Sequence, residues 1–206
     1  MKFVKIGDKM ASAVSLGCMR MASLDEKGVD AIMNKALERG INFFDHADIY
    51  GAGNSEKLFG DYLKRSHVKR ESIFIQTKCA IHDGQYDFSK EHILRSVEGS
   101  LKRLGVDYVD YLLLHRPDTL MQPEEVAEAF DILQSSGKVR GFGVSNHNAM
   151  QIELLKTEVK QSLDINQLQF SVTEAGMITS GMNVNMKNPE SAMRDGGILE
   201  YSRIKK

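Results

Sequence analysis

The chain has 206 residues, of which 42% are hydrophobic and 27% are charged, and its formal net charge is −1. This is the composition of an ordinary globular domain, and it provides enough apolar side chains for a core. It excludes the basic excess that a nucleic-acid-binding surface needs, so we expect no nucleic-acid partner.

Short apolar runs alternate with segments of helical periodicity along the chain. The predicted strands are, in chain order, Val14–Gly17, Ile41–Phe44, Ile73–Lys78, Tyr108–His115, Gly141–Asn146 and Ile165–Phe170. Between them, apolar residues recur at the i, i+3 and i+4 spacing of one helix face. The predicted helices are one that contains Val29–Leu37 and is capped by Gly40, one that begins at Ser55, one from Ser89 that ends before Gly105, one that begins at Pro123, and one over Ala149–Val159.

After the sixth strand the pattern loosens into a long polar loop over residues 171–192, and a last helix is predicted over Glu190–Ile204. Strands that alternate with helices indicate a parallel sheet with right-handed crossovers. Residues 1–206 are therefore expected to form a single α/β domain. Two architectures fit this pattern, namely a doubly wound open sheet and a TIM-type (β/α)8 barrel.

Polar side chains stand at the ends of the predicted strands. Asp45 follows the second strand, Lys78 ends the third, His115 ends the fourth, Asn146 ends the fifth, and Gln167 lies in the sixth. A barrel gathers the carboxyl ends of its strands around one mouth, whereas an open sheet spreads them across its width. Convergence of these residues, with Tyr50 nearby, favours the barrel.

These residue types form a consistent proton donor. An ammonium group stabilises a neighbouring phenolate, so Lys78 can make Tyr50 a better acid, and Asp45 can hold the charge on Lys78. A neutral His115 can donate a hydrogen bond that orients a carbonyl oxygen. Proton delivery to that oxygen is half of a carbonyl reduction. The other half is a hydride that no side chain supplies, so the pattern implies a nicotinamide cofactor.

Several sequence motifs resemble the aldo-keto reductase family. The segments GINFFDHADIYG, EKLFG, SLKRLGVDYVDYLLLHRPD, SGKVRGFGVSN and NQLQFS follow the family's order and spacing from about Gly17 to Phe170. The residues Asp45, Tyr50, Lys78 and His115 match its catalytic tetrad. The phrases DHADIYG and HRPD further resemble a bacterial oxidoreductase branch of the family.

The resemblance implies a (β/α)8 barrel whose base is plugged by an N-terminal hairpin, here over residues 1–14. It implies NADPH as the cofactor and a small aldehyde or ketone as the substrate. Tyr50 would be the proton donor, tuned by Lys78 and Asp45, and His115 would orient the carbonyl. The implied cofactor contacts are Gly17, Cys18, Met19, Asp45, Ser145, Asn146 and Gln167, and His46 is a candidate substrate contact.

The pattern departs from the family in one respect: about six of the eight strand–helix units are found, and strands seven and eight are missing. We therefore expect a C-terminally truncated reductase. An alternative is a non-catalytic fragment without independent activity, or a protein that keeps the scaffold for binding, as the family's potassium-channel β subunits partly do. A Rossmann dehydrogenase is disfavoured, because GAGNSE and GFGVSN lack the spacing of a dinucleotide fingerprint.

The remaining features fit a soluble cytoplasmic protein. The N-terminus MKFVKIGDKM is too charged for a signal peptide, and no apolar run is long enough to span a membrane. Cys18 and Cys79 lack metal-site spacing and are expected to be free thiols. His67, His82 and His92 lie in polar surroundings and are expected at the surface.

Overall fold

The structure, a computed structural model, describes residues 1–179 and 201–202. Its centre is a curved parallel sheet of six strands in the order β10-β9-β8-β5-β4-β3. The strands are β3 (Leu16–Gly17), β4 (Phe43–Asp45), β5 (Phe74–Cys79), β8 (Val109–Leu114), β9 (Val139–Ser145) and β10 (Leu163–Gln167). Each lies within a few residues of its predicted position, and all run in the same direction, as predicted.

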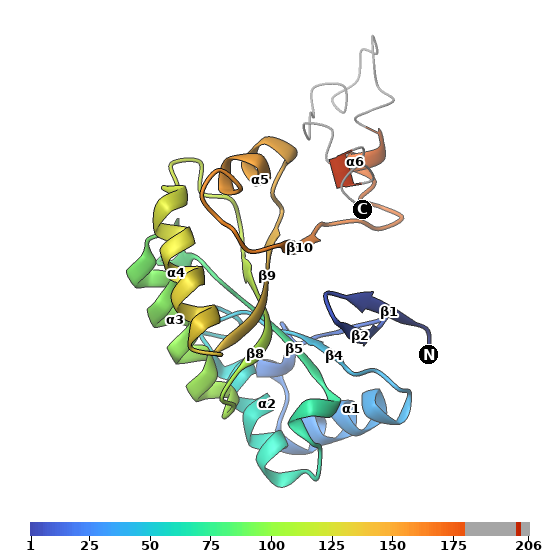
Figure 1. Cartoon of the computed structure of the whole chain (residues 1–206). Helices are drawn as coiled ribbons and strands as arrows, with labels where there is room; N and C mark the ends of the chain where they lie inside the picture. Colours follow the sequence, from blue (N-terminus) through green and yellow to red (C-terminus); the bar gives the residue numbers. More distant parts are fainter. Residues whose placement is uncertain (180–200, 203–206) are drawn as a thin grey trace.

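Helices cover the outer side of this sheet (Figure 1). They are α1 (Glu26–Glu38), α2 (Asn54–Arg65), α3 (Lys90–Leu104), α4 (Pro123–Ser135) and α5 (Ala149–Leu155), and the short α6 (Gly176–Thr179) follows β10. Helix α3 is capped at both ends by the residues expected from the sequence. The side chain of Ser89 accepts a hydrogen bond from the His92 backbone N–H at the start of α3, and Gly105 ends that helix in the left-handed conformation.

The main core lies between the sheet and these helices. Alternate residues of the strands point outward into it, among them Phe44, Ile75, Leu112 and Phe142. Helix side chains such as Phe59, Ile93, Leu104 and Phe130 meet them, and all of these are buried. The ring centroids of Phe130 and Phe142 lie 4.1 Å apart. This packing fixes the strands and so fixes the positions of their carboxyl ends.

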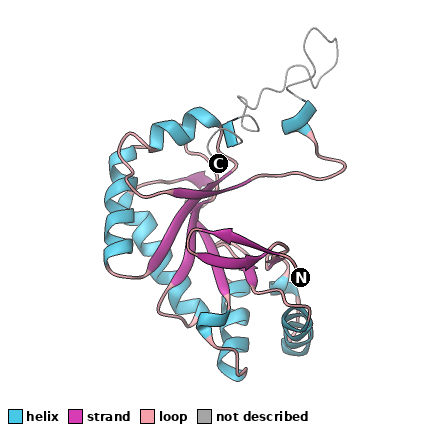
Figure 2. Cartoon of the chain, turned by 45° about the vertical axis from the view of Figure 1, so that its right-hand side comes forward, coloured by secondary structure: helices cyan, strands magenta, loops and turns pink. Residues whose placement is uncertain are grey.

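An N-terminal hairpin covers part of the inner face of the sheet (Figure 2). Its strands β1 (Phe3–Ile6) and β2 (Lys9–Ser12) are antiparallel. Ala11 of the hairpin packs with Phe74 and Tyr111, side chains that point inward from β5 and β8. Gly7 at the turn has a positive φ of 57°, and a Cβ there would lie 2.5 Å from the Tyr111 hydroxyl. The hairpin therefore fits closely against the inner face.

A buried carboxylate ties the hairpin to the sheet. Asp110 is 1% exposed and accepts hydrogen bonds from the Arg70 guanidinium at 2.8 Å and from the Ile75 backbone N–H at 2.9 Å. It also forms an ion pair with Lys9 of the hairpin. Arg70 precedes β5, so this group lies at the amino ends of the strands. The opposite end is left for the polar residues predicted there.

Some predicted boundaries were wrong. Helix α5 ends at Leu155 instead of Val159, because the chain turns there and Glu158 donates its backbone N–H to the Leu155 carbonyl. A second small hairpin, β6 (Ile81–His82) with β7 (Gln85–Tyr86), was not predicted, because two-residue strands show no periodicity. The predicted loop over 171–192 contains α6. Most of the rest of that loop, and most of the predicted last helix over Glu190–Ile204, lie outside the described residues.

No helix within the described residues is long and apolar enough to cross a membrane.

Candidate active site

A cavity of about 680 Å³ opens at the carboxyl ends of the strands. Five strands and the loops after them supply its polar lining. The residues that line it are Tyr50 and Gly51 from the loop after β4, Lys78 from β5, His115 and Arg116 after β8, Ser145 and Asn146 at the end of β9, Gln167, Leu168 and Gln169 at the end of β10, and Met19, Ile49 and Ile81. The structure thus brings together most of the polar residues singled out in the sequence.

Lys78 lies at the centre of the polar group. Its side chain is 2% exposed, and its ammonium donates to Asp45 Oδ1 at 2.7 Å, to the His46 backbone carbonyl at 2.9 Å and to the Tyr50 hydroxyl oxygen at 3.2 Å. An ammonium has three N–H donors, and all three are used here. The cation is therefore fixed in place between the carboxylate and the phenol.

Asp45 is held by more than its ion pair. Its Oδ1 atom also accepts from Gln76 Nε2 at 2.6 Å, and its Oδ2 atom accepts from Gln167 Nε2 at 3.2 Å. Gln76 in turn donates to Gln167 Oε1 at 3.2 Å. The carboxylate is 6% exposed, so these donors compensate for its loss of water.

Tyr50 has the geometry of a proton donor to the cavity. Because the Lys78 ammonium donates to its oxygen, the phenolic O–H is not used in that bond and remains available to a ligand. The loop that carries it depends on Gly51, which has a positive φ of 58°. A Cβ at Gly51 would lie 2.3 Å from the Ala22 Cβ. A glycine after Tyr50 is therefore a steric requirement of this turn.

His115 faces Tyr50 across the cavity. The two ring centroids lie 5.8 Å apart, and the ring planes meet at 81°. Burial lowers the pKa of His115 to about 4, and the charges of Lys78 and Arg116 act in the same direction. The imidazole is therefore neutral at pH 7. Within the described residues its Nδ1 atom has no hydrogen-bond partner.

Three polar residues stand at the ends of β9 and β10. The Ser145 hydroxyl donates to the Gln167 carbonyl at 3.0 Å, and Asn146 Nδ2 donates to Ser145 Oγ at 3.0 Å. Asn146 has a positive φ of 61°, a strained conformation for a residue other than glycine. Such strain is found preferentially at functional sites, and here it places an exposed amide at the cavity.

Four of the predicted contacts are not in the cavity lining, and one of them, Asp45, lies behind Lys78 as its ion-pair partner. Gly17 pairs with Asp45 in the sheet but does not line the cavity, and Cys18 is 1% exposed within the main core. His46, predicted to contact substrate, is fully buried, and its ring centroid lies 4.5 Å from that of Phe59. Side chains alternate along a strand, so the residue after the inward-facing Asp45 points to the helix side of the sheet.

The burial of His46 predicts a pH dependence of stability. Burial lowers the pKa of His46 from 6.5 to about 3. Below pH 6.5 the unfolded chain binds a proton here and the folded chain does not, so the free energy of unfolding falls as the pH falls toward 3. We expect a loss of about 1.5 kcal/mol between pH 6.5 and pH 5 from this group alone.

The comparison of His46→Leu with the unchanged protein isolates this effect. The free energy of unfolding would be measured in urea at pH 5 and at pH 6.5. It is expected to change less between these two pH values in the variant than in the unchanged protein. The control is His67→Leu, which removes an exposed histidine and should leave the difference as it is. An equal pH difference in His46→Leu and the unchanged protein would contradict the burial argument.

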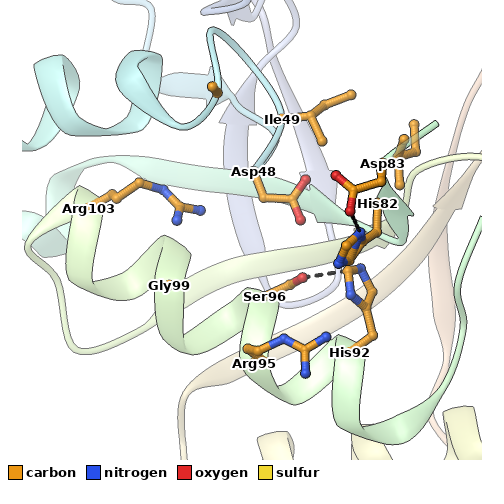
Figure 3. A pocket seen from close by; sticks show the side chains of 11 residues that line it. Asp48, Ile49, His82, Asp83, His92, Arg95, Ser96, Gly99 and Arg103 are labelled. Carbon is orange, nitrogen blue, oxygen red and sulfur yellow. Dashed lines mark hydrogen bonds and ion pairs between the residues drawn. The ribbon is translucent and has the colours of Figure 1, made fainter. Parts of the chain in front are cut away.

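A second cavity, of about 590 Å³, adjoins the first, and Figure 3 shows the residues that line it. Ile49 and Ile81 line both. His92 was expected at the surface, but it lies in the first turn of α3 and is only 5% exposed, and its Nε2 atom lies 3.3 Å from Ser96 Oγ. Burial also raises the pKa of Asp48, in the same lining, to about 6.

Three polar residues of the site were not singled out in the sequence, namely Gln76, Arg116 and Gln169. Gln76 contacts Asp45, and it could have been found because it lies two residues before Lys78 on the same face of β5. Arg116 directly follows His115 and carries no periodic signal. Both cysteines are free, as expected, and both are buried. Within the described part of the chain, no group of three or more His, Cys, Asp or Glu side chains is arranged to hold a metal ion.

Comparisons with known proteins point in one direction. A sequence model of the Aldo/keto reductase family matches residues 13–186. The chain is 45% identical over 161 residues to a Bacillus subtilis protein named uncharacterized oxidoreductase YcsN. The match covers 73% of this chain and 54% of YcsN. The chain is also 36% identical over 195 residues to a 6-dehydroglucose reductase of Agrobacterium fabrum. That match covers 88% of this chain and 66% of the relative.

The fold is also similar to solved structures. The aldo-keto reductase AKR11C1 from Bacillus halodurans, in its holo form, matches with a TM-score of 0.72 and 32% identity over 83% of this chain and 58% of that one. The curved six-stranded sheet with outer helices corresponds to part of such a (β/α)8 barrel, which confirms the predicted fold class. The chain spans about half the length of YcsN.

Proposed function

Because this chain belongs to the aldo/keto reductase family, we propose that it acts in the NADPH-dependent reduction of an aldehyde or ketone to an alcohol. The observation that carries the proposal is the Lys78 ammonium, which donates both to Asp45 at 2.7 Å and to the Tyr50 hydroxyl at 3.2 Å. Tyr50 and Lys78 line one cavity with His115. The name of the 6-dehydroglucose reductase, a similar protein, supports the reaction class.

The residues at the ends of β9 and β10 fit the carboxamide of a nicotinamide. A carboxamide needs acceptors for its NH₂ group and a donor for its oxygen. Within the described residues, the bonds of Asn146 use its nitrogen, so its side-chain oxygen can still accept. Gln167 Nε2 donates to Asp45 and keeps a second N–H. When bound, the cofactor would supply the hydride.

In the proposed mechanism, Tyr50 gives its proton to the carbonyl oxygen as negative charge develops there. His115, neutral at pH 7, donates a hydrogen bond to the same oxygen and holds it near the Tyr50 hydroxyl. The Lys78 ammonium then stabilises the phenolate that remains. Asp45 accepts a hydrogen bond from the Lys78 ammonium and so keeps it in place beside the Tyr50 hydroxyl.

The proposal is tested by following the oxidation of NADPH, through its absorbance, in the presence of small aldehydes. We expect consumption of NADPH that depends on both the protein and the aldehyde, with a smaller rate for NADH. Circular dichroism of the same sample establishes that the protein is folded. A folded sample that binds NADPH but leaves every aldehyde unreduced would overturn the proposed function.

A further inference from the structure

One charged residue of the cavity has no part in the proposed chemistry. Arg116 directly follows His115 and lines the same cavity, and its side chain is exposed. Within the described residues its guanidinium forms no hydrogen bond or ion pair. Its charge is close enough to the His115 imidazole to contribute to the lowered pKa of that ring. A free guanidinium therefore lies near the group that would hold the carbonyl oxygen.

The charge balance of the cavity favours an anion. Among the described residues that line the cavity, only Lys78 and Arg116 carry a charge, and none is an aspartate or a glutamate. The charge of Lys78 is compensated by Asp45 at 2.7 Å. Arg116 is left as the uncompensated charge. Its planar guanidinium presents a fork of donors that matches the two oxygens of a carboxylate.

Four apolar side chains also line the cavity. Met19 and Ile49 are 55% and 41% exposed, and Ile81 and Leu168 line the same cavity. These side chains can cover the hydrophobic body of a ligand while a polar end reaches the arginine. The cavity lining thus combines apolar side chains with one uncompensated positive charge, that of Arg116.

We propose that Arg116 determines substrate specificity by binding a negatively charged group, such as a carboxylate, on the carbonyl substrate. This inference rests on the proposed function and names the substrate class of that site. Arg116 follows β8, as His115 does, whereas the residues that fit the carboxamide are at the ends of β9 and β10. This arrangement assigns Arg116 to the substrate side of the cavity.

The test compares two aldehydes of nearly the same shape, 4-carboxybenzaldehyde and 4-nitrobenzaldehyde. The carboxylate and the nitro group are both planar, but only the first is charged. The unchanged protein is expected to show a higher kcat/KM for the carboxylate. In Arg116→Gln the ratio of the two kcat/KM values should fall about tenfold, because an arginine–carboxylate contact is a charge-assisted pair. Arg116→Lys should keep part of the preference.

Controls separate this effect from others. Arg39→Gln removes an exposed arginine just past α1, and it should leave the ratio unchanged. The KM for NADPH should be the same in Arg116→Gln, and a large increase would assign the arginine to the cofactor phosphates and overturn the inference. The alcohol formed from 4-carboxybenzaldehyde, 4-(hydroxymethyl)benzoate, carries the same carboxylate. Its binding, measured by calorimetry without cofactor, should weaken in Arg116→Gln.

The two proposals fail in different ways. If the protein reduces both aldehydes and Arg116→Gln leaves their ratio unchanged, the inference about Arg116 is wrong and the proposed function stands. If a folded protein reduces neither aldehyde, the proposed function is overturned and the substrate class falls with it.

Discussion

Replacement of Tyr50 by phenylalanine is expected to lower the rate of carbonyl reduction by about 10²–10⁴-fold, the contribution typical of a general acid. The substitution removes only the hydroxyl group. The ring can keep its edge contact with His115 at 5.8 Å, and Lys78 keeps its bonds to Asp45 and to the His46 carbonyl. The site therefore loses its proton donor and little else.

The measurement is the initial rate of aldehyde reduction at saturating NADPH, together with the affinity for NADPH by calorimetry. The affinity should be nearly unchanged. A matched control is Tyr86→Phe, which removes the hydroxyl of a tyrosine that is 48% exposed in β7, and it should retain full activity. Turnover in Tyr50→Phe equal to that of the unchanged protein would remove Tyr50 from the mechanism.

The substitution Lys78→Met is expected to affect both stability and activity. It leaves the Asp45 carboxylate, 6% exposed, without its cation, and an uncompensated buried charge costs about 3–5 kcal/mol. It also removes the ammonium that would stabilise the Tyr50 phenolate. We therefore expect a lower free energy of unfolding in urea and a rate of reduction close to background.

A double variant separates the two effects. In Lys78→Met with Asp45→Leu the buried charge is gone, so much of the stability should return while the activity stays lost. The control is Lys35→Met, which removes an exposed ion pair with Glu38 and should change the stability by less than about 1 kcal/mol. A double variant that recovers activity along with stability would show that Lys78 serves the fold alone.

Much of the fold could be predicted because local signals agreed with the tertiary structure. Helix α3 begins after Ser89 and ends before Gly105, as expected. A serine cap and a left-handed glycine depend only on residues within a few positions of the helix end, so both can be recognised in the sequence. Strand β8 is buried along its whole length, and its nearly continuous apolar run is typical of a strand buried on both faces. The hairpin β6–β7 gave no such signal, because it depends on turn geometry and on contacts distant in sequence.

The candidate site was predictable to the extent that strand ends determine it. Asp45, Lys78 and His115 come together because parallel strands deliver their carboxyl ends to one edge. His46 was misplaced because the side-chain alternation of β4 was not applied to it, and that alternation sends it toward Phe59. Arg116 could not be recognised, because its importance depends on which charges are compensated around it.

The most direct test of the account is to follow isotope into the product. The protein would be given NADPH that carries deuterium at both hydrogen positions of the nicotinamide C4, together with 4-nitrobenzaldehyde, and the alcohol would be examined by NMR. Hydride transfer from the cofactor to the carbonyl carbon predicts deuterium on the carbinol carbon, and this alcohol should form more slowly in Tyr50→Phe. An alcohol without deuterium, or no alcohol from a folded protein that binds NADPH, would contradict it.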